Sequence, residues 1–461
     1  MSTVDDMMAG PVPRRRIAVA SMVGTTVEFF DFYIYATAAV SVFPHLFYPK
    51  GNHTTALLAS LATFGLAFVA RPLGSILFGY FGDRAGRKAT LVGSLLTMGI
   101  ATFVIGLLPT YQEIGVVAPV LLAIMRFSQG LALGGEWSGA ALLVTENAEP
   151  DKRARAAMWP QLGAPFGFLL ANGLFLILIS RLGHSNLEPD AAGPFLTWGW
   201  RIPFLLSVVL VAVGLYVRLR LTETPVFARA LARGERVRNP LTVVFHTSWQ
   251  ELIIGTFVML ATYTLFYTVT TWALSYGTSR RPPRGRGLGF GYVDFLHIQL
   301  IAVLFFAATV PIAGALADRF GRRRTLLVVT AAIIGYGASF GLMLTPGSAT
   351  KVSAALFLII GMTLMGLSFG PMSAVLPELF PTNVRYTGSG IAYNMSGILG
   401  AAVAPFIATW LATKHGVVWV GVYLIVVAIL TILALLLMRE TKNISLEKPV
   451  DDHAGDAAIT G

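Results

Sequence analysis

The chain of 461 residues lacks cysteine altogether and has only seven histidines. Without cysteine, disulfide bonds, thiol nucleophiles and thiolate metal sites are excluded, and the scattered histidines offer no close pair of metal ligands. The sequence also lacks a Walker phosphate loop and any nucleophile paired with a base. We therefore predict that the protein is not an enzyme and that it uses neither a metal nor a cofactor.

Charged residues are also scarce: they make up only 12% of the chain, whereas 55% of its residues are hydrophobic. The mean hydropathy of +0.70 is typical of a protein that crosses a bilayer many times. The net charge of +11 raises the question of a nucleic acid partner. Since the basic residues lie in short loops between apolar runs, membrane topology explains them better, and we expect no such partner.

Twelve apolar runs are each long enough to cross the hydrocarbon core as a helix. They lie near residues 17–43, 55–78, 89–108, 116–145, 157–182 and 201–219 in the first half, and near 252–276, 292–316, 325–344, 352–376, 388–411 and 417–438 in the second. We predict an all-α membrane protein with two six-helix halves, residues 17–220 and 250–438, joined by a polar linker at 221–249. Tails of residues 1–16 and 439–461 flank the halves.

The basic loops indicate how the chain is oriented. Most of them fall on the side of the two chain ends, which predicts that both termini are cytoplasmic. One loop contradicts this bias, since Arg280, Arg281, Arg284 and Arg286 follow the seventh run on the predicted outer side. We leave the role of this outer loop open.

A glycine-rich, charged segment after the second apolar run recurs after the eighth. It occupies residues 79–88 and 314–324. Asp83 matches Asp318 and Arg87 matches Arg322 at a constant offset, because 318 − 83 and 322 − 87 both equal 235. We interpret each copy as a polar turn at the membrane surface, and the chain as two related halves.

Polar side chains within the apolar runs mark a second feature. Glu28 and Asp31 lie in the middle of the first run, Arg71 lies in the second, and Arg126 and Glu136 lie in the fourth. An unpaired charge at this depth is costly, and burial and a neighbouring cation shift the pKa of a carboxylate in opposite directions. An aspartate that alternately gains and loses an arginine partner would therefore load and release a proton.

These motifs resemble the major facilitator superfamily, whose signature is Gly-x-x-x-Asp-Arg-x-Gly-Arg-Lys/Arg. The resemblance covers about residues 15–441 and is narrower to the metabolite:proton symporters, which include carriers for shikimate, 2-oxoglutarate, citrate, and proline or betaine. The further motifs that carry it are Glu28-Phe29-Phe30-Asp31-Phe32-Tyr33-Ile34-Tyr35, Arg71-Pro72-Leu73-Gly74, Gly134-Gly135-Glu136-Trp137, Trp198-Gly199-Trp200-Arg201-Ile202-Pro203-Phe204 and Pro377-Glu378-Leu379-Phe380-Pro381. The second copy of the signature has Ala317 where the first has Gly82.

The resemblance implies a proton-coupling pair and an inner gate. The coupling pair would be Asp31 and Arg126, with Glu28 and Glu136 as second choices, although a permanent buried salt bridge is the alternative. In the gate, we expect Asp83 to meet a neighbouring helix N-terminus or an arginine. The predicted gate residues are Gly79, Asp83, Arg84, Gly86, Arg87, Asp318, Arg319, Gly321 and Arg322, with Glu223 and Glu440 as partners.

A further set of polar residues suits a small, hydrogen-bonding solute. Arg71 either supplies a fixed positive charge for a carboxylate or extends to the membrane surface. Gln161 and Asn172, eleven residues or three turns apart, share one helix face that we expect to look inward. The remaining predicted substrate ligands are Tyr35, Gln129, Tyr263, Tyr267, Tyr393 and Asn394, each of which has packing within the helix bundle as its alternative.

The sequence thus predicts a multi-pass transporter of the cell membrane, acting as a monomer, that couples proton flow to uptake of an organic acid or zwitterion. An osmolyte symporter for proline or betaine is one alternative, because aromatic side chains suit a quaternary amine. A drug:proton antiporter is another, with only a fragment of its glycine-rich pattern at 163–167. A non-transporting receptor would usually carry a longer cytoplasmic extension than the tail after Thr441.

Overall fold

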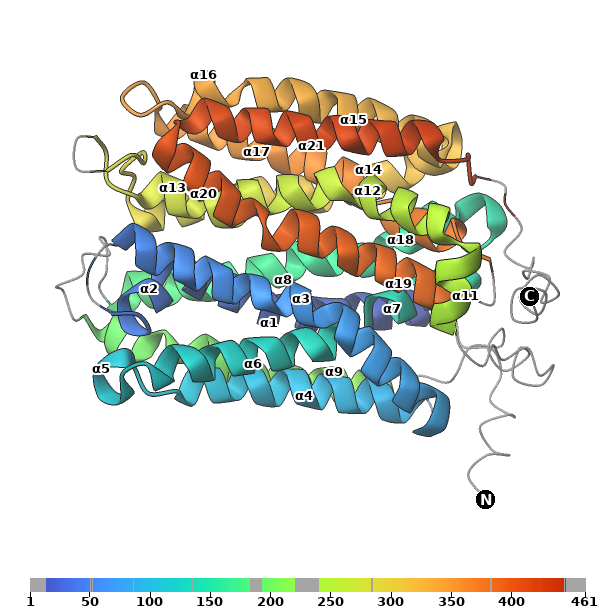
Figure 1. Cartoon of the computed structure of the whole chain (residues 1–461), viewed down its shortest axis with the longest axis horizontal. Helices are drawn as coiled ribbons and strands as arrows, with labels where there is room; N and C mark the ends of the chain where they lie inside the picture. Colours follow the sequence, from blue (N-terminus) through green and yellow to red (C-terminus); the bar gives the residue numbers. More distant parts are fainter. Residues whose placement is uncertain are drawn as a thin grey trace.

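A computed structural model describes residues 14–49, 51, 53–85, 87–134, 136–182, 193–219, 240–282, 285–381, 384–442 and 444. All regular elements in these ranges are helices, which run side by side along one direction (Figure 1). The described part of the chain begins and ends at the same end of the bundle. We call this the inner end, since the sequence predicts that it faces the cytoplasm, and the opposite one the outer end.

The first half of the chain forms the lower group of helices in Figure 1, coloured blue to green. Its elements are α1 (Arg14–Ser41), α2 (Phe43–Leu46), α3 (His53–Ala85), α4 (Arg87–Leu107), α5 (Tyr111–Ile114), α6 (Val117–Leu133), α7 (Glu136–Glu146), η2 (Pro150–Lys152), α8 (Arg153–Leu182), η3 (Phe195–Gly199) and α9 (Arg201–Leu219). Pairs of these helices pack along their lengths, notably α1 with α8, α3 with α6 and α4 with α9.

The second half forms the upper group, coloured yellow-green to red (Figure 1). Its elements are α11 (Pro240–Thr247), α12 (Trp249–Tyr267), η4 (Thr268–Trp272), α13 (Ala273–Thr278), α14 (Tyr292–Phe320), α15 (Arg322–Ala338), α16 (Phe340–Leu344), α17 (Lys351–Phe369), α18 (Met372–Glu378), α19 (Arg385–Ser396), η5 (Gly397–Ala402), α20 (Ala404–Lys414) and α21 (Val417–Leu437). The halves meet chiefly where α14 and α18 pack on α8, and where α19 and η5 pack on α3.

The spans match the predicted all-helical architecture. Within the described ranges, ten helical segments are long and apolar enough to cross a membrane by length and composition. The apolar stretch of α4, Val92–Leu107, is shorter. The run expected at 325–344 is formed by α15 and α16. With these two included, the twelve predicted spans are present.

One local prediction is wrong. Residues 79–88 are not a polar turn, because α3 continues to Ala85 and α4 begins at Arg87. Charged residues near the end of a membrane helix reach water without breaking it, so the helix outlasts its apolar run. In the second copy the turn contracts to Gly321, whose φ of +99° favours glycine. Within the predicted linker at 221–249, the short helix α11 precedes α12, whereas residues 220–239 lie outside the described ranges, so the bounds of the linker stay a prediction.

Several spans are interrupted near their middle. The fourth is divided into α6 and α7 next to Gly134, and the tenth is divided into α17 and α18 at Gly370 and Pro371. Gly370 follows Gly135 by 370 − 135 = 235 residues, the offset of the repeated motif. The seventh and eleventh spans pass through π-turns, η4 and η5. Such irregular turns often accompany functional sites in helical proteins.

The basic outer loop has a structural explanation for two of its arginines. Arg281 Nε donates to the carbonyl of Leu288 at 2.5 Å, and Arg286 donates to the carbonyl of Thr413. These bonds tie the loop to itself and to the end of α20. Two of the outer arginines therefore hold the loop in place through hydrogen bonds. This gives them a role although they lie on the side opposite to most basic residues.

Candidate substrate and proton site

Two buried arginines from the first half share an aromatic ring at the centre of the bundle. Arg71 on α3 and Arg126 on α6 place their guanidinium carbons 4.9 and 4.3 Å from the ring centroid of Phe32. Arg71 is 7% exposed and also lies 4.5 Å from Phe68. It therefore stays inside the bundle and does not extend to the membrane surface, which removes one of its two predicted roles.

Close contact between α3 and α6 holds these arginines. A Cβ atom on Gly74 would overlap the carbonyl of Leu131, and one on Gly130 would overlap the backbone of Ala67. Only hydrogen at these positions lets the two backbones meet. The helices that carry Arg71 and Arg126 are thus fixed relative to each other by direct backbone contact.

Tyrosines of the second half face this pair. Tyr267 packs against Phe32 and Phe68, with ring centroids 6.2 and 5.5 Å away, and Tyr263 packs 6.4 Å from Phe68. Tyr393 stacks on Trp137 of the first half, with centroids 3.9 Å apart. Three of the four predicted tyrosine ligands, Tyr263, Tyr267 and Tyr393, therefore gather where the two halves meet, around the arginines.

Asp31 and Arg126 are connected indirectly. None of the ion pairs among the described side chains joins them; instead Arg126 Nη1 donates to Gln129 Oε1 at 3.0 Å. Gln129 Nε2 donates to Thr102 Oγ1 at 2.7 Å, and Thr102 Oγ1 donates to Asp31 Oδ2 at 3.4 Å. The alternative of a permanent Asp31–Arg126 salt bridge does not hold in this conformation, and the coupling role of the pair stays a prediction.

Several polar atoms of this centre have no partner. Asp31 Oδ1, Arg71 Nε, Arg126 Nη2 and the hydroxyl of Tyr35 are buried without a hydrogen bond. Each such atom costs free energy, on the order of 1–3 kcal/mol and more when charged. We call Asp31, Arg71, Thr102, Arg126 and Gln129 the central site; its unpaired donors and acceptor are available to bond to a ligand and a proton.

The two second-choice acids lie nearby. Glu136 on α7 is buried and accepts from Ser94 Oγ. Glu28 is buried one turn before Asp31 on α1. Both remain candidates for proton binding.

Three predicted substrate amides have other partners. Asn172 accepts from Thr37 at 2.7 Å and donates to its own helix, which favours packing of α1 on α8 over a substrate contact. Gln161 donates across the halves to the carbonyl of Phe369 at 2.8 Å. Asn394 donates across the halves to Ser75 at 3.0 Å and to the carbonyl of Gly134 at 3.1 Å. The last two therefore join the halves in this conformation.

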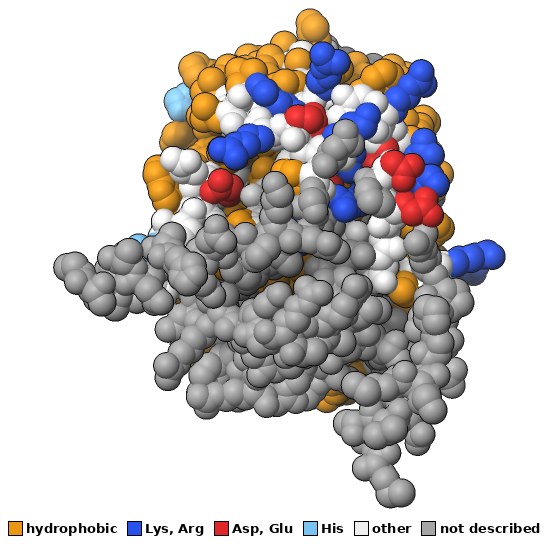
Figure 2. Space-filling view, turned by 90° about the vertical axis from the view of Figure 1, so that its right-hand side faces the viewer, with side chains coloured by type: hydrophobic (Ala, Val, Ile, Leu, Met, Phe, Trp, Pro, Cys, Tyr) orange, Lys and Arg blue, Asp and Glu red, His pale blue; other side chains and the backbone are white. Residues whose placement is uncertain are grey.

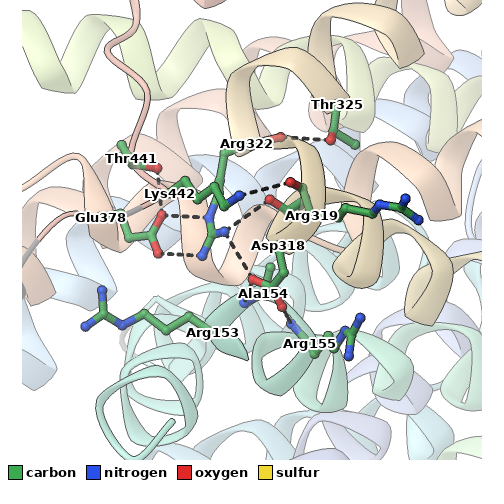
Figure 3. Close-up of polar contacts among 12 residues, drawn as sticks. Arg153, Ala154, Arg155, Asp318, Arg319, Arg322, Thr325, Glu378, Thr441 and Lys442 are labelled. Atoms are coloured by element: carbon green, nitrogen blue, oxygen red, sulfur yellow. Dashed lines mark hydrogen bonds and ion pairs between the residues drawn. The ribbon is translucent and has the colours of Figure 1, made fainter. Parts of the chain in front are cut away.

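A network of charges at the inner end joins the two halves (Figure 3). Arg322 is fully buried, and its guanidinium lies 3.1 Å from Asp318 and 3.2 Å from Glu378. Asp318, from the second half, accepts from the backbone amides of Ala154 and Arg155 at 3.1 and 3.0 Å. These amides belong to the first turn of α8 in the first half, where the helix dipole favours an anion. The expectation made for Asp83 is thus realised by its repeat, Asp318.

The C-terminal segment extends this network. Glu440 accepts from the amides of Arg322 and Arg323 at 2.8 and 3.1 Å, and Thr441 donates to Glu378 at 2.6 Å. A Cβ atom on Gly321 would meet the Glu440 carboxylate. We call Asp318, Arg322, Glu378, Glu440 and Thr441 the inner network. Figure 2 looks onto the inner end and shows Lys and Arg side chains with acids among them over the second half.

The first copy of the motif, residues 79–88, lies outside the described side chains. The side chains of Asp83, Arg84 and Arg87 lie outside the described part of the chain, as do Gly86 and Glu223, and of Gly79 only the helical backbone is described. Arg319, a predicted gate residue, is exposed; its carbonyl accepts from Lys442 at 2.9 Å. Their roles in a gate stay predictions.

Sequence reasoning missed several members of both groups. Thr102 is a single hydroxyl in an apolar run, and nothing in the sequence marks it. Glu378 was recognised only as part of a family motif, although the repeat of the two halves also marks its position. Glu146 and Arg153 in the first half are matched by Glu378 and Arg385 in the second, since 378 − 146 and 385 − 153 both equal 232.

Comparison with known proteins is consistent with this architecture. Residues 21–400 match the model of the Major Facilitator Superfamily. The Inner membrane metabolite transport protein YhjE of Escherichia coli K12 is 54% identical over 94% of this chain and 96% of its own. The Shikimate transporter of the same strain is 35% identical over 93% of this chain and 95% of its own.

The fold also matches a solved structure of the proton:xylose symporter XylE bound to 6-bromo-6-deoxy-D-glucose. The TM-score is 0.71, with 17% identity over 94% of this chain and 98% of that one. At this identity the likeness concerns the fold alone. Together with the family match and the apolar helices, it establishes that the chain is a multi-pass membrane protein that belongs to the Major Facilitator Superfamily and groups with its metabolite transporters.

Proposed function

We propose that the protein is a proton-coupled symporter that takes up a small organic acid. The observation that carries this proposal is the pair of buried arginines on Phe32, which leaves Arg71 Nε and Arg126 Nη2 without acceptors. A guanidinium presents parallel donors that match the two oxygens of a carboxylate. An acid bound here would satisfy both cations at once.

The surrounding tyrosines support an acid that also carries hydroxyl groups. Tyr263, Tyr267 and Tyr393 approach the arginines from the second half and are amphipathic, each with a ring to pack and a hydroxyl to hydrogen-bond. A hydroxylated carboxylate, such as the substrate named for the shikimate transporter, fits this chemistry. Because the ligands come from both halves, a bound substrate would draw the halves together.

The proton would be carried by Asp31, which is 1% exposed and is linked to Arg126 through Gln129 and Thr102. Arg126 would serve two partners: Asp31, through Gln129 and Thr102, when the site is empty, and the substrate carboxylate when it is loaded. Competition for one cation makes proton binding and substrate binding mutually favourable. Movement of a proton down its gradient then drives accumulation of the acid.

The inner network would act as the gate of this cycle. Its contacts between Asp318 and the start of α8 cross the halves and must break before the inner end opens. Contacts that exist in one conformation only set the equilibrium between the two. We therefore assign the network to stabilising the state in which the inner end is closed.

A zwitterionic osmolyte is the second candidate, favoured by the aromatic rings at the centre, since these attract a quaternary amine. Two buried cations repel such an amine, which favours the acid. A drug antiporter would differ in the direction of transport.

The deciding experiment uses proteoliposomes that contain the full chain and a pH-sensitive dye. Shikimate, 2-oxoglutarate, citrate, proline and glycine betaine are offered one at a time from outside. The proposal expects that at least one acid acidifies the lumen and that betaine does not. Acidification by betaine alone would favour the osmolyte carrier, whereas alkalinisation would indicate an antiporter.

A further inference from the structure

Four buried side chains on three helices form one continuous hydrogen-bonded chain. It runs from Arg126 and Gln129 on α6 to Thr102 on α4 and ends at Asp31 on α1, with links of 3.0, 2.7 and 3.4 Å. None of the four is more than 1% exposed. The cation that faces the substrate position is therefore connected to the proposed proton carrier only through a glutamine and a threonine.

The chemistry of the groups fixes the direction of this chain. An arginine can only donate, so the amide oxygen of Gln129 must face Arg126 and its amide nitrogen must face Thr102. The Thr102 oxygen then accepts from Gln129. Its single hydrogen remains for one of two acceptors, Asp31 Oδ2 or the carbonyl of Met98 at 2.9 Å. With Arg126 in place, the Thr102 hydrogen does not point to Gln129 and so stays available to the Asp31 carboxylate.

We propose that Thr102 is a positioning residue that transmits the occupancy of Arg126 to Asp31. When a substrate carboxylate draws Arg126 away, the Gln129 amide is free to rotate by half a turn and present its oxygen to Thr102. The threonine hydrogen then turns to Gln129, and Asp31 loses its donor. A buried carboxylate without a donor takes up a proton more readily. The inference rests on the proposed symport and names the residue that couples its two ligands.

Other charges near Asp31 do not supply this link. Glu136 of α7 is a second buried acid, and Glu28 lies on the same helix as Asp31. Arg71 of α3 and Arg126 lie against Phe32, the next residue along α1. The charged residues of α8 and α9, which also pack on α1, stand near the ends of those helices. Within the described contacts, Thr102 is the side chain that donates to the Asp31 carboxylate.

The test compares Thr102→Val, which keeps the shape but removes the hydroxyl, with Thr102→Ser, which keeps the hydroxyl. Thr97→Val is the matched control, because Thr97 lies on the same helix and donates to the carbonyl of Gly93 at 2.8 Å, within its own helix. Purified full-length protein in weakly buffered detergent receives shikimate as the probe, and a pH indicator reports the protons taken up. Binding is measured on the same samples.

The expected result for Thr102→Val is that the number of protons taken up per bound shikimate falls at least about fivefold, the lower limit of ordinary coupling between sites. Its substrate affinity should also lose most of its pH dependence. Thr102→Ser and Thr97→Val should behave as wild type. A purely packing role for Thr102 would lower binding and proton uptake together and leave the pH profile in place.

Failure of the inference can be told from failure of the proposed function. If the wild type takes up no proton with shikimate or with any other acid of the panel, the symport itself is wrong. If the wild type takes up protons and Thr102→Val takes up as many, the positioning role is wrong. Should the valine variant elute as aggregate, Thr102→Ala replaces it, and undiminished proton uptake there would equally overturn the inference.

Discussion

The inner network and the central site are both buried and charged, yet they differ in how completely their polar atoms are paired. In the inner network, Arg322 contacts two carboxylates and one carbonyl, and Asp318 accepts from two amides. In the central site, Arg71 Nε, Arg126 Nη2 and Asp31 Oδ1 have no hydrogen bond. The network is complete by itself, whereas the central site is incomplete without a ligand.

This difference in pairing indicates that the inner network and the central site have different roles. A buried charge that is fully paired contributes to one conformation and is costly to disrupt. A buried charge that is left unpaired destabilises the empty state and favours whatever ligand can pair it. Substitutions in the network should therefore change which conformation the protein adopts. Substitutions in the central site should change what the protein binds and how binding is coupled to protons.

The largest expected effect is loss of accumulation in Asp31→Asn. One proton cancels the charge of a monocarboxylate, so the pH gradient drives this step, and one pH unit corresponds to about 1.4 kcal/mol or roughly tenfold accumulation. The variant mimics the protonated acid, so it should lose this drive yet still exchange labelled substrate between two pools. Uptake into energised proteoliposomes and counterflow exchange are measured side by side. Concentrative uptake at the wild-type level would remove Asp31 from the coupling mechanism.

The next effect should come from the network. Arg322→Gln leaves Glu378 and Asp318 buried without their cation, and removing one partner of a buried pair costs about 3–5 kcal/mol. If that cost falls on the closed state alone, the population should shift towards the open inner end more than about 100-fold. Because the chain has no cysteine, single cysteines introduced at each end report accessibility. Arg324→Gln, at an exposed position on the same helix, is the control. Equal labelling in all three proteins would argue against a gate.

An intermediate effect is expected at the arginines of the central site. Arg71→Gln removes a cation that pairs with the substrate and should weaken binding of an acid by about 1.5–3 kcal/mol. Arg126→Lys keeps the charge but loses the planar fork, so weak binding with poor transport should remain. Affinities are measured by titration of the purified variants. If the affinity for the best acid survives in Arg71→Gln, that residue does not bind the carboxylate.

The smallest effect should follow Glu440→Gln. This carboxylate is exposed and caps the first turn of α15, where a negative charge contributes about 0.3–1 kcal/mol. The variant should open the inner end only a few-fold more often and leave the affinity for the acid unchanged. The same cysteine labelling applies, and a shift as large as that of Arg322→Gln would show that the network is not organised around Arg322.

Much of the fold could be predicted because helices in a bilayer must satisfy their own backbone and be long enough to cross it. The apolar runs located the spans, and the offset of 235 residues located the repeat that contains Asp318 and Arg322. The end of α3 was missed because hydropathy marks where a helix leaves the membrane and not where it stops. The positions of Asp31 and Arg126 along their helices place both residues at a similar depth in the membrane.

The contacts themselves could not be predicted. Thr102 is one hydroxyl among many in apolar helices, and only the packing of α4 against α6 brings it next to Gln129. Likewise, Asp318 accepts from the backbone amides of Ala154 and Arg155. Almost every residue has such an amide, so the sequence does not mark these two as partners. Asn172 shares the predicted inward side of α8 but meets Thr37 instead. Interactions of this kind depend on how helices are rotated about their axes, which periodicity leaves undetermined.

The central claim is that an anion on the arginines and a proton on Asp31 bind together. It is tested most directly by measuring the affinity for the best acid against pH, over a range in which the acid itself stays ionised. If one proton binds with each anion, the affinity for the acid should rise about tenfold for each unit by which the pH falls. This slope applies at pH values where the proton site is deprotonated in the empty protein and protonated in the loaded one. Asp31→Asn, which no longer titrates, should give a flat profile with affinity near the low-pH value of the wild type. A variant that kept the full pH dependence would contradict the account and assign the proton to Glu28 or Glu136.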